Sequence, residues 1–189
     1  FLAVDSDDVT LVIHSIDERE NFNGRTVISI DYMYEYPHGG MGTNLEIDKE
    51  TGDIVHYHDM GYQLMQDMGD EAAEGDTISK DEALEKAINY LKEYAPSILH
   101  HYAMPTQDAT FEEYMNAYQF KFPRTVNGIP VNGDHISVGI AKDGSLQLLN
   151  VNYNDDIEWP SADKVISKED ATQAFKDALT LDLRYVQAD

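Results

Sequence analysis

The stretch FPRTVNGIPVNGDHISVGIAKDGSLQLLNV, residues 122–151, carries the clearest strand pattern in this chain. Apolar side chains recur there at every second position, which is the period of a half-buried β-strand. A short turn sequence, AKDG, separates two such runs. Together with the residues just before it, the stretch therefore predicts an antiparallel meander. Its alternating apolar positions are Tyr118, Phe120 and Phe122, then Ile136, Val138 and Ile140, then Leu146 and Leu148.

Three glycines in this stretch are predicted to be turn residues. Gly128 and Gly133 flank the segment Ile129-Pro130-Val131, and Gly144 closes the next hairpin. Proline donates no hydrogen bond to a neighbouring strand, so it suits the edge of a sheet. An extended partner chain can add to such an edge. Ile129 and Val131 are therefore candidate partner-binding residues.

A second meander is predicted nearer the start of the chain. Ile28, Ile30 and the tyrosines 32, 34 and 36 alternate with polar residues. Leu45 and Ile47 begin the next strand, the sequence DKETGD turns it, and Ile54, Val55 and Tyr57 return. A further strand is expected at residues 9–16.

A repeated helix follows each meander. TISKDEALEKAINYL, residues 77–91, is echoed by VISKEDATQAFKDAL, residues 165–179. Ser79 with Glu82, and Ser167 with Asp170, have the spacing of a helix N-cap and its reciprocal carboxylate. Helical spacing also predicts one apolar face in each copy, made of Ala83, Ala87, Ile88 and Leu91 in the first and of Ala171, Ala174, Phe175 and Ala178 in the second.

The order strands, helix, strands, helix predicts an α+β fold with antiparallel sheets and helices packed on one face. Two tandem units are expected, residues 1–95 and residues 96–189, each an antiparallel β meander packed on one helix. Residues 60–76, rich in Gly, Asp and Glu, are the predicted linker.

The second unit resembles the YcdB/YcdC repeat family, which is similar to the PepSY and thermolysin-propeptide-like (FTP) modules. The resemblance is carried by Phe122 and Arg124, the segment NGIPV with Gly133, Asp143-Gly144, and the helix start Ile166-Ser167. The first unit resembles the family less closely, because YPHGGMGTN stands where NGIPVNG would be expected.

The resemblance implies two PepSY-like units in a protein of the cell envelope or the extracellular space. It further implies that the protein has no enzymatic activity of its own. A protein partner, and the regulation or inhibition of a peptidase in particular, is what the PepSY relationship suggests.

Composition excludes some classes of partner. The chain has 36 acidic and 13 basic residues and a formal net charge of -23. Nucleic acid and anionic lipid both require clustered Lys and Arg, so neither is expected as a partner. No cysteine is present to form a disulfide or a thiolate metal site, and no apolar run approaches the ~20 residues of a membrane-spanning helix.

Hard oxygen donors crowd into NYNDDIEWP, where Asn154, Asp155, Asp156 and Glu158 are the candidate cation ligands. In a chain this acidic, a solvated loop is the favoured interpretation, so no cofactor is predicted beyond adventitious calcium. The turn DKETGD lacks the ligand spacing of a calcium loop and is better explained as a hairpin. His56 and His58 share a strand face but lack a third local ligand for zinc.

Tyr32, Tyr34 and Tyr36 form a stripe along one strand. Tyrosines with an apolar body and a polar tip suit a surface that recognises peptide or glycan. They suit the edge of a small core equally well, and this second interpretation is favoured because tyrosines are common on half-buried strands.

No nucleophile elbow, zinc-binding HExxH or phosphate-binding loop occurs in the sequence, which favours a non-catalytic module that binds a protein partner. A cell-wall or glycan-binding module that uses the tyrosines and acidic loops is the first alternative. The second is a hydrolase whose site is assembled from acids distant in sequence, with Glu112-Glu113 and Asp155-Asp156 as the paired acids.

Overall fold

The computed structural model describes residues 7–61, 64, 77–105, 109–112, 116–152 and 157–179. No helix within these ranges is long and apolar enough to cross a membrane. The elements, in chain order, are β1 (Thr10–Glu20), β2 (Thr26–Tyr36), β3 (Gly39–Asp48), β4 (Ile54–His58), α2 (Lys80–Tyr94), the 3-10 helix η1 (Pro96–His101), β5 (Thr110–Glu112), β6 (Ala117–Val126), β7 (Ile129–Ala141), β8 (Leu146–Asn152), the 3-10 helix η3 (Ala162–Lys164) and α3 (Lys168–Ala178).

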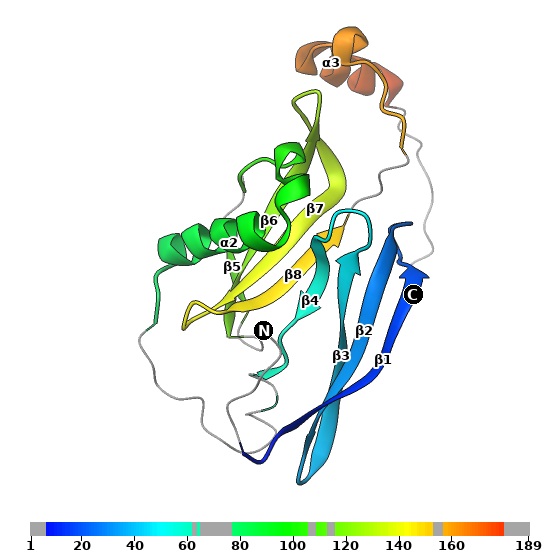
Figure 1. The fold of residues 1–189 in the computed structure, drawn as a ribbon. Coiled ribbons are helices and arrows are strands. Elements are labelled where there is room, and N and C mark those ends of the chain that lie inside the picture. The colour runs from blue at the N-terminus through cyan, green and yellow to red at the C-terminus, as the bar shows by residue number, and fades with distance from the viewer. Residues whose placement is uncertain are drawn as a thin grey trace, which may run out of the picture. The chain divides into compact units, whose positions relative to one another are not determined.

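The eight strands of the described residues belong to one sheet, in the order β1-β2-β3-β4-β8-β7-β6-β5 (Figure 1). Strands β1 to β4 form one antiparallel meander and β5 to β8 form another. The two meanders join where β4 pairs antiparallel with β8 and Tyr57 lies opposite Leu149. The predicted α+β class with an antiparallel sheet is confirmed, while the division into tandem units at residues 95 and 96 stays a prediction.

The hairpin turns follow the sequence closely. Asn127 and Gly128 connect β6 to β7 with φ angles of 52° and 76°, the left-handed pair that a two-residue type I′ turn requires. Gly52 and Gly144 also have positive φ angles, 79° and 88°. These values confirm the turns predicted at Gly128 and Gly144 and the assignment of DKETGD as a hairpin. Gly133, also predicted as a turn residue, lies instead within β7, with a φ angle of 95°.

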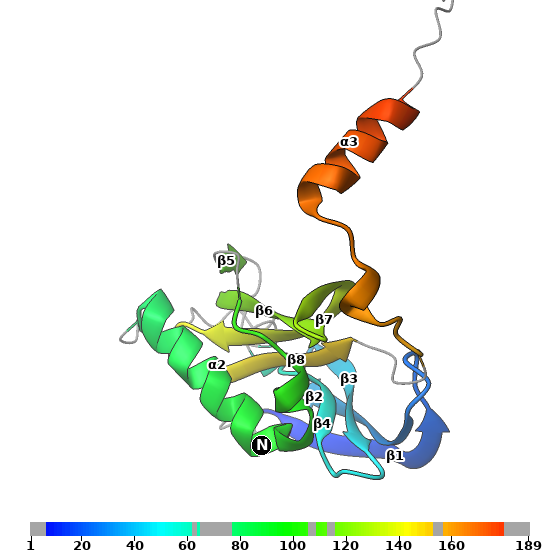
Figure 2. The ribbon, with the colours of Figure 1, turned by 90° about the horizontal axis from the view of Figure 1, so that it is seen from above.

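The hydrophobic core draws on both meanders, and a large part of it lies on one face of the second. Phe120 and Phe122 of β6 pair with Val138 and Ile136 of β7, so all four side chains share a face, and all are buried. Helix α2 lies along this face, as Figure 2 shows from above. Its buried residues Ala83, Ala87 and Leu91 belong to the same core cluster, as the predicted helix face requires.

Helix α2 contacts chiefly β6 and β7, which follow it in the chain, whereas the sequence predicted that it would cover its own meander. Two hydrogen bonds anchor it on the β7–β8 turn: the Ile78 amide donates to the Lys142 carbonyl at 2.9 Å, and the Tyr90 hydroxyl donates to the Gly144 carbonyl at 3.2 Å. Pairing of β4 with β8 brings the apolar face of the second meander within reach of the helix.

Helix α3 differs from α2 in its burial. It belongs to a second compact unit, residues 158–189, separate from residues 1–157. The predicted apolar face of this helix, which includes Ala171, Ala174, Phe175 and Ala178, has no buried residue.

The predicted capping box of α2 is present. The Glu82 amide donates to the Ser79 hydroxyl oxygen at 3.3 Å, and the Ser79 amide donates to the Glu82 carboxylate at 2.8 Å. We expect Ser79→Ala to lower the free energy of unfolding by about 1 kcal/mol, because the helix loses a side-chain acceptor for its first-turn amides. Ser79→Thr, which keeps the hydroxyl, is the control. Urea denaturation measures both, and equal losses in the two variants would contradict this role.

Candidate partner-binding surface

The outermost strand β1 presents a long edge. It has 11 residues, and among the described residues it pairs with β2 on one side only (Figure 1). The backbone N–H and C=O groups on its other side therefore have no neighbouring strand in the described part of the chain. Such a row of groups is a template for pairing with another chain. The opposite edge strand, β5, has only 3 residues.

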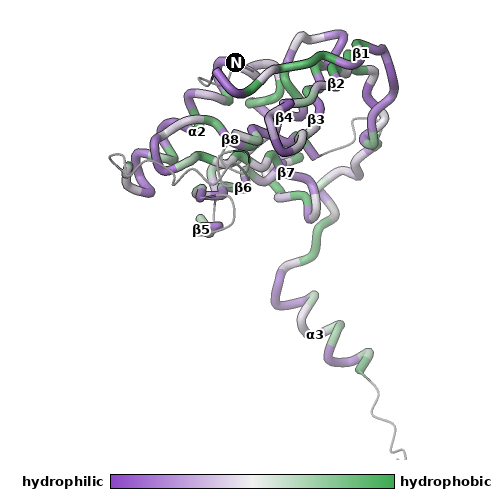
Figure 3. The backbone as a smooth tube through the Cα atoms, turned by 90° about the horizontal axis from the view of Figure 1, so that it is seen from below, coloured by the Kyte–Doolittle hydropathy of each residue, from purple (hydrophilic) through white to green (hydrophobic). Residues whose placement is uncertain are grey.

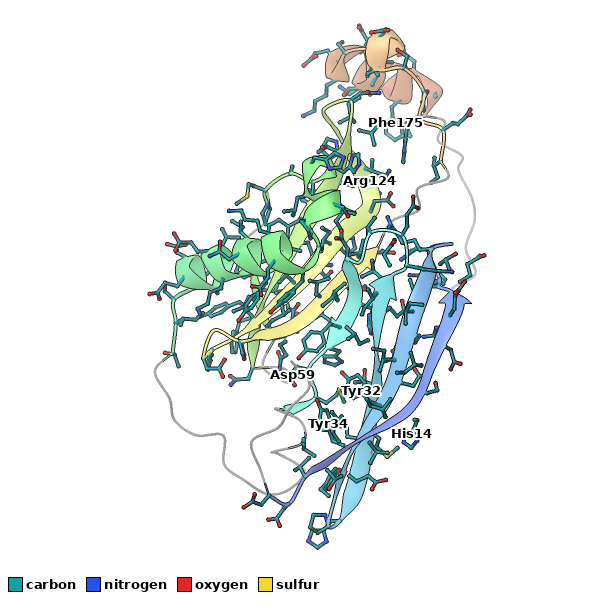
Figure 4. All side chains as sticks on the ribbon, in the orientation of Figure 1. His14, Tyr32, Tyr34, Asp59, Arg124 and Phe175 are labelled. Atoms are coloured by element: carbon teal, nitrogen blue, oxygen red, sulfur yellow. The ribbon has the colours of Figure 1, made fainter. Side chains whose placement is uncertain are left out.

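Charge and a bulge divide β1 into two halves. Residues 10–13 carry no charged side chain, whereas residues 17–20 are Asp, Glu, Arg and Glu. The register shifts between Ile13 and Ser15, so His14 stands at an irregularity near the middle of the strand (Figure 4). Bulges and charged side chains discourage unspecific pairing of edge strands. Residues 10–13 are therefore the part of the edge best suited to accept a partner strand.

Two exposed isoleucines lie beside this edge. Ile13 is 53% exposed and Ile16 is 62% exposed. They lie opposite Tyr32 and Ile30 of β2, so both side chains are on the same face of the sheet. An added strand could make backbone hydrogen bonds at the edge and apolar contacts with these two side chains.

The predicted candidates Ile129 and Val131 lie at a second, shorter edge. β7 begins at Ile129, but β8 pairs with it only from His135 onward. The Asn152 side-chain amide donates to the Gly133 carbonyl at 3.2 Å, beyond the last of these pairs. Ile129 is 45% exposed and Val131 is half-buried, so the segment has accessible apolar side chains but little length.

The tyrosine stripe lies mainly inside the protein. Tyr32 is 2% exposed and Tyr34 is 3% exposed, and Tyr36 is half-buried. The rings of Tyr32 and Tyr34 meet edge to face with centroids 5.7 Å apart (Figure 4). This burial fits the core-edge interpretation, and it leaves little ring surface of the first two tyrosines for a ligand.

In and around these rings, burial favours the uncharged form of each ionisable side chain. Burial, followed by the nearby Asp59, raises the pKa of Tyr34 to about 12, and burial raises the pKa of Tyr32 further. Burial also raises the pKa of Asp59, despite a 2.9 Å hydrogen bond from the Gly61 amide. His58 is half-buried, and burial lowers its pKa. These side chains therefore have the electrostatics of a protein interior.

Of the four cation candidates, Asn154, Asp155 and Asp156 lie outside the described residues, and Glu158 is exposed. In the ranges that the structure describes, no group of three His, Cys, Asp or Glu could hold a metal ion.

The predicted histidine pair lies on β4. Nδ1 of His56 is 3.3 Å from Oδ1 of Asn150 on β8, so a side chain of the sheet already contacts this ring. His58, the second member of the pair, lies two residues further along the same strand.

Two of the three carboxylates of the DKETGD turn already bind the protein's own donors. One oxygen of Asp48 accepts from the Glu50 and Thr51 amides at 2.9 and 3.0 Å, and the other accepts from Arg25 at 2.9 Å. Asp53 accepts from the amide and the hydroxyl of Ser97. These bonds account for both acids as turn and packing residues.

The sequence predicts a first strand at residues 9–16, but neither its full length nor its position at the edge of the sheet. The bulge shifts Ile16 out of the every-second-residue pattern that Leu11 and Ile13 begin, so the pattern does not continue evenly along the strand. The high charge of residues 17–20 also hides the second half of the strand. The charge of residues 17–20 nonetheless indicates an edge strand, because charged side chains are typical of such strands.

A solved structure shares this fold. The chain is similar to the Bacillus megaterium YpeB C-terminal domain, with a TM-score of 0.51 and 17% sequence identity. The similarity covers 88% of this chain and 66% of that one, and at this identity it concerns the fold alone. No curated protein matches the sequence.

A family model gives a more specific result. The model described as the YcdB, YcdC repeated domain matches residues 32–155, which is more than half of the chain. The match runs from within β2 to just beyond β8 and includes the stretch NGIPVNG. The resemblance noted in the sequence is thereby confirmed, and the chain belongs to the YcdB/YcdC repeated-domain family.

Proposed function

We propose that this protein is a non-catalytic binding module of the cell envelope or the extracellular space, which holds an extended segment of a protein partner as an added strand on β1. The observation that supports the proposal is the long edge of β1 with Ile13 and Ile16 exposed beside it. In strand addition, backbone hydrogen bonds supply affinity and alternate side chains supply specificity.

The charge of the chain indicates what the partner segment would contain. Residues 10–13 are uncharged, while Asp17, Glu18 and Glu20 make the other half of β1 acidic. A suitable segment has alternating apolar residues at one end and Lys or Arg at the other. With a net charge of -23 on the module, association with such a segment should be faster at low salt.

A peptidase is the partner class that we favour, because the family is related to PepSY and propeptide-like modules. In this form of the proposal, the module restrains the peptidase by holding one of its extended segments. This step rests on the family relationship, whereas strand addition rests on the geometry of β1.

A pair of proline variants tests strand addition. Of two neighbouring strand residues, one N–H points to the paired strand and the other points to the open edge. Leu11→Pro and Val12→Pro therefore differ in effect: one breaks the β1–β2 pairing and lowers stability, and the other leaves the fold intact but removes an outward donor. Thermal unfolding identifies which is which.

A phage-displayed library of random dodecapeptides serves as the probe. We expect selected peptides to alternate apolar and polar residues, to carry Lys or Arg, and to lose at least ~10-fold in affinity for the stable proline variant. Selected peptides that bind the stable proline variant as well as the unchanged chain would contradict strand addition at β1.

The peptidase step has its own test. Peptidases that the module captures from culture supernatant are assayed with and without it, and we expect inhibition by the unchanged chain but not by the stable proline variant. If peptides bind but no peptidase is captured or inhibited, the peptidase is rejected as the partner, while strand addition at β1 stands.

A further inference from the structure

The dipeptide Asn-Gly occurs three times in the sequence, at Asn23, Asn127 and Asn132. In such a pair, the backbone nitrogen of the glycine can attack the side-chain amide of the asparagine, because glycine has no Cβ atom to obstruct the approach. Asparagine is among the thermolabile residues of proteins. All three pairs lie in the compact unit of residues 1–157, but in different settings. These settings determine which pair reacts most readily.

The pair at Asn127 forms the turn between β6 and β7, two strands that lie side by side in Figure 3. Val126 and Ile129 form the last strand pair before the turn, so Asn127 and Gly128 stand outside the ladder. Both residues are exposed. A Cβ atom on Gly128 would meet nothing within 4 Å, so the turn has open space around its glycine.

Neither reacting group of this pair is held by a hydrogen bond. Within the described residues, the Asn127 side chain has no hydrogen-bond partner, and the Gly128 amide donates to no carbonyl. The side-chain carbonyl carbon and the glycine nitrogen can therefore approach each other through rotations of the turn alone. No hydrogen bond of the folded protein has to break first.

Asn23-Gly24 is the same dipeptide with both groups held. It lies in the turn between β1 and β2. The Asn23 side-chain amide donates to the Val151 carbonyl at 2.9 Å, and the Gly24 amide donates to the Asn21 carbonyl at 3.0 Å. Gly24 has a φ angle of 77°, close to the 76° of Gly128. The two glycines therefore differ in their hydrogen bonds and not in this backbone angle.

Asn132-Gly133 has an intermediate setting. It lies inside β7, and Asn132 is exposed. The Gly133 carbonyl accepts from the Asn152 side-chain amide at 3.2 Å. This bond holds the peptide group that follows the glycine, while the Asn132 side chain is not held by it. One side of Gly133 is thus restrained.

We propose that Asn127 is a site of spontaneous deamidation, with water as the co-reactant. The Gly128 nitrogen forms a bond to Cγ of Asn127, and the bond between Cγ and Nδ2 breaks. Nδ2 leaves as ammonia together with the proton that the Gly128 nitrogen gives up. Water then opens the resulting succinimide ring at either of its carbonyl groups. The products are aspartate and isoaspartate in place of Asn127.

The modification changes the β6–β7 turn in two ways. Both products add a negative charge, and isoaspartate also inserts a methylene group into the backbone. A two-residue turn with two positive φ angles does not accommodate this additional group. Ile129 follows the turn directly, so the change falls beside one of the candidate partner-binding residues.

Peptide mapping by mass spectrometry of the 189-residue chain, after incubation at mildly alkaline pH, measures the rate at each asparagine. A parallel sample in guanidinium chloride gives the rates of the unfolded chain and so corrects for neighbouring residues. In the folded protein we expect Asn127 to react within ~3-fold of its unfolded rate. Asn23 should react at least ~10-fold below its own unfolded rate, because its hydrogen bonds must open first. Asn132 should lie between the two.

Two matched variants locate the reaction independently. Asn127→Asp removes the reactive amide, and aspartate tolerates a positive φ angle, so this variant should keep the fold. It should lose most of the early gain of negative charge that ion-exchange chromatography detects, whereas Asn23→Asp should leave that gain unchanged. Circular dichroism verifies the fold of both variants. The proposal is wrong if Asn127 is protected as strongly as Asn23, or if Asn127→Asp leaves the gain of charge unaltered.

Discussion

Leu149→Ala is expected to lower the free energy of unfolding by about 3–5 kcal/mol. Leu149 is fully buried at the centre of the sheet, where it lies opposite Tyr57 of β4 on one side and Val138 of β7 on the other. Its truncation leaves a cavity where the two meanders join. The flanking strands are fixed by pairing on both sides, so the site has little freedom to collapse around the missing atoms.

The neighbouring residue Leu148 provides the matched control. It is half-buried and points to the other face of the same strand. Leu148→Ala should therefore cost less than half as much, as measured for both variants by urea denaturation. Equal losses would show that the face of β8 that carries Leu149 is not the more deeply buried one.

Asp48→Ala is expected to lower the free energy of unfolding by about 3–5 kcal/mol, because it removes the carboxylate that pairs with a buried Arg25. The two side chains are only 9% and 8% exposed and are joined at 2.9 Å. Asp48 also accepts the two amides that shape the β3–β4 turn. Chemical denaturation at neutral pH measures the loss.

An exposed ion pair supplies the control for this prediction. Lys49 and Glu18 approach more closely, at 2.7 Å, but their side chains are 50% and 52% exposed. Water screens such a pair, so Glu18→Gln should cost less than about 1 kcal/mol. If it costs as much as Asp48→Ala, burial is not what makes the Arg25 pair important.

The pH dependence gives a second readout for Asp48. Burial alone would raise the pKa of its carboxyl group, but hydrogen bonds from Thr51, Arg25 and Glu50 outweigh burial and lower it below the ordinary 3.8. A lowered carboxyl pKa stabilises the folded state above the ordinary value, and this stabilisation is lost as the pH falls through the folded-state value. The difference between Asp48→Ala and the unchanged chain should thus shrink between pH ~5 and pH ~2.

Features that depend on local spacing could be predicted from the sequence. Asn127-Gly128 predicts a tight turn because few other pairs tolerate two positive φ angles. Ser79 with Glu82 predicts a helix start because the N-cap bond spans only three residues. The alternation of Phe120 and Phe122 predicts a buried strand face for the same kind of reason: consecutive side chains of a strand point to opposite sides.

Features that depend on partners distant in sequence could not be predicted in this way. The tyrosine stripe of β2 is equally compatible with a surface and a core, and its burial follows from the packing around Tyr32 and Tyr34. The bulge at His14 displaces the isoleucines of β1 from a simple alternation. Leu149, not Leu148, points to the core, because the register of β8 shifts by one residue beside Ile140.

The sequence by itself determined most of the strands, the hairpin turns and the helix starts, because each depends on side chains a few residues apart, and its motifs also indicated the family. Only the tertiary structure decided that β4 pairs with β8, that α2 covers the strands that follow it, and that β1 lies at an edge of the sheet. Both meanders offer similar apolar faces and unpaired edges. Which faces are covered and which edges are paired depends on the total apolar area buried by the whole sheet, and no short stretch of sequence specifies this area.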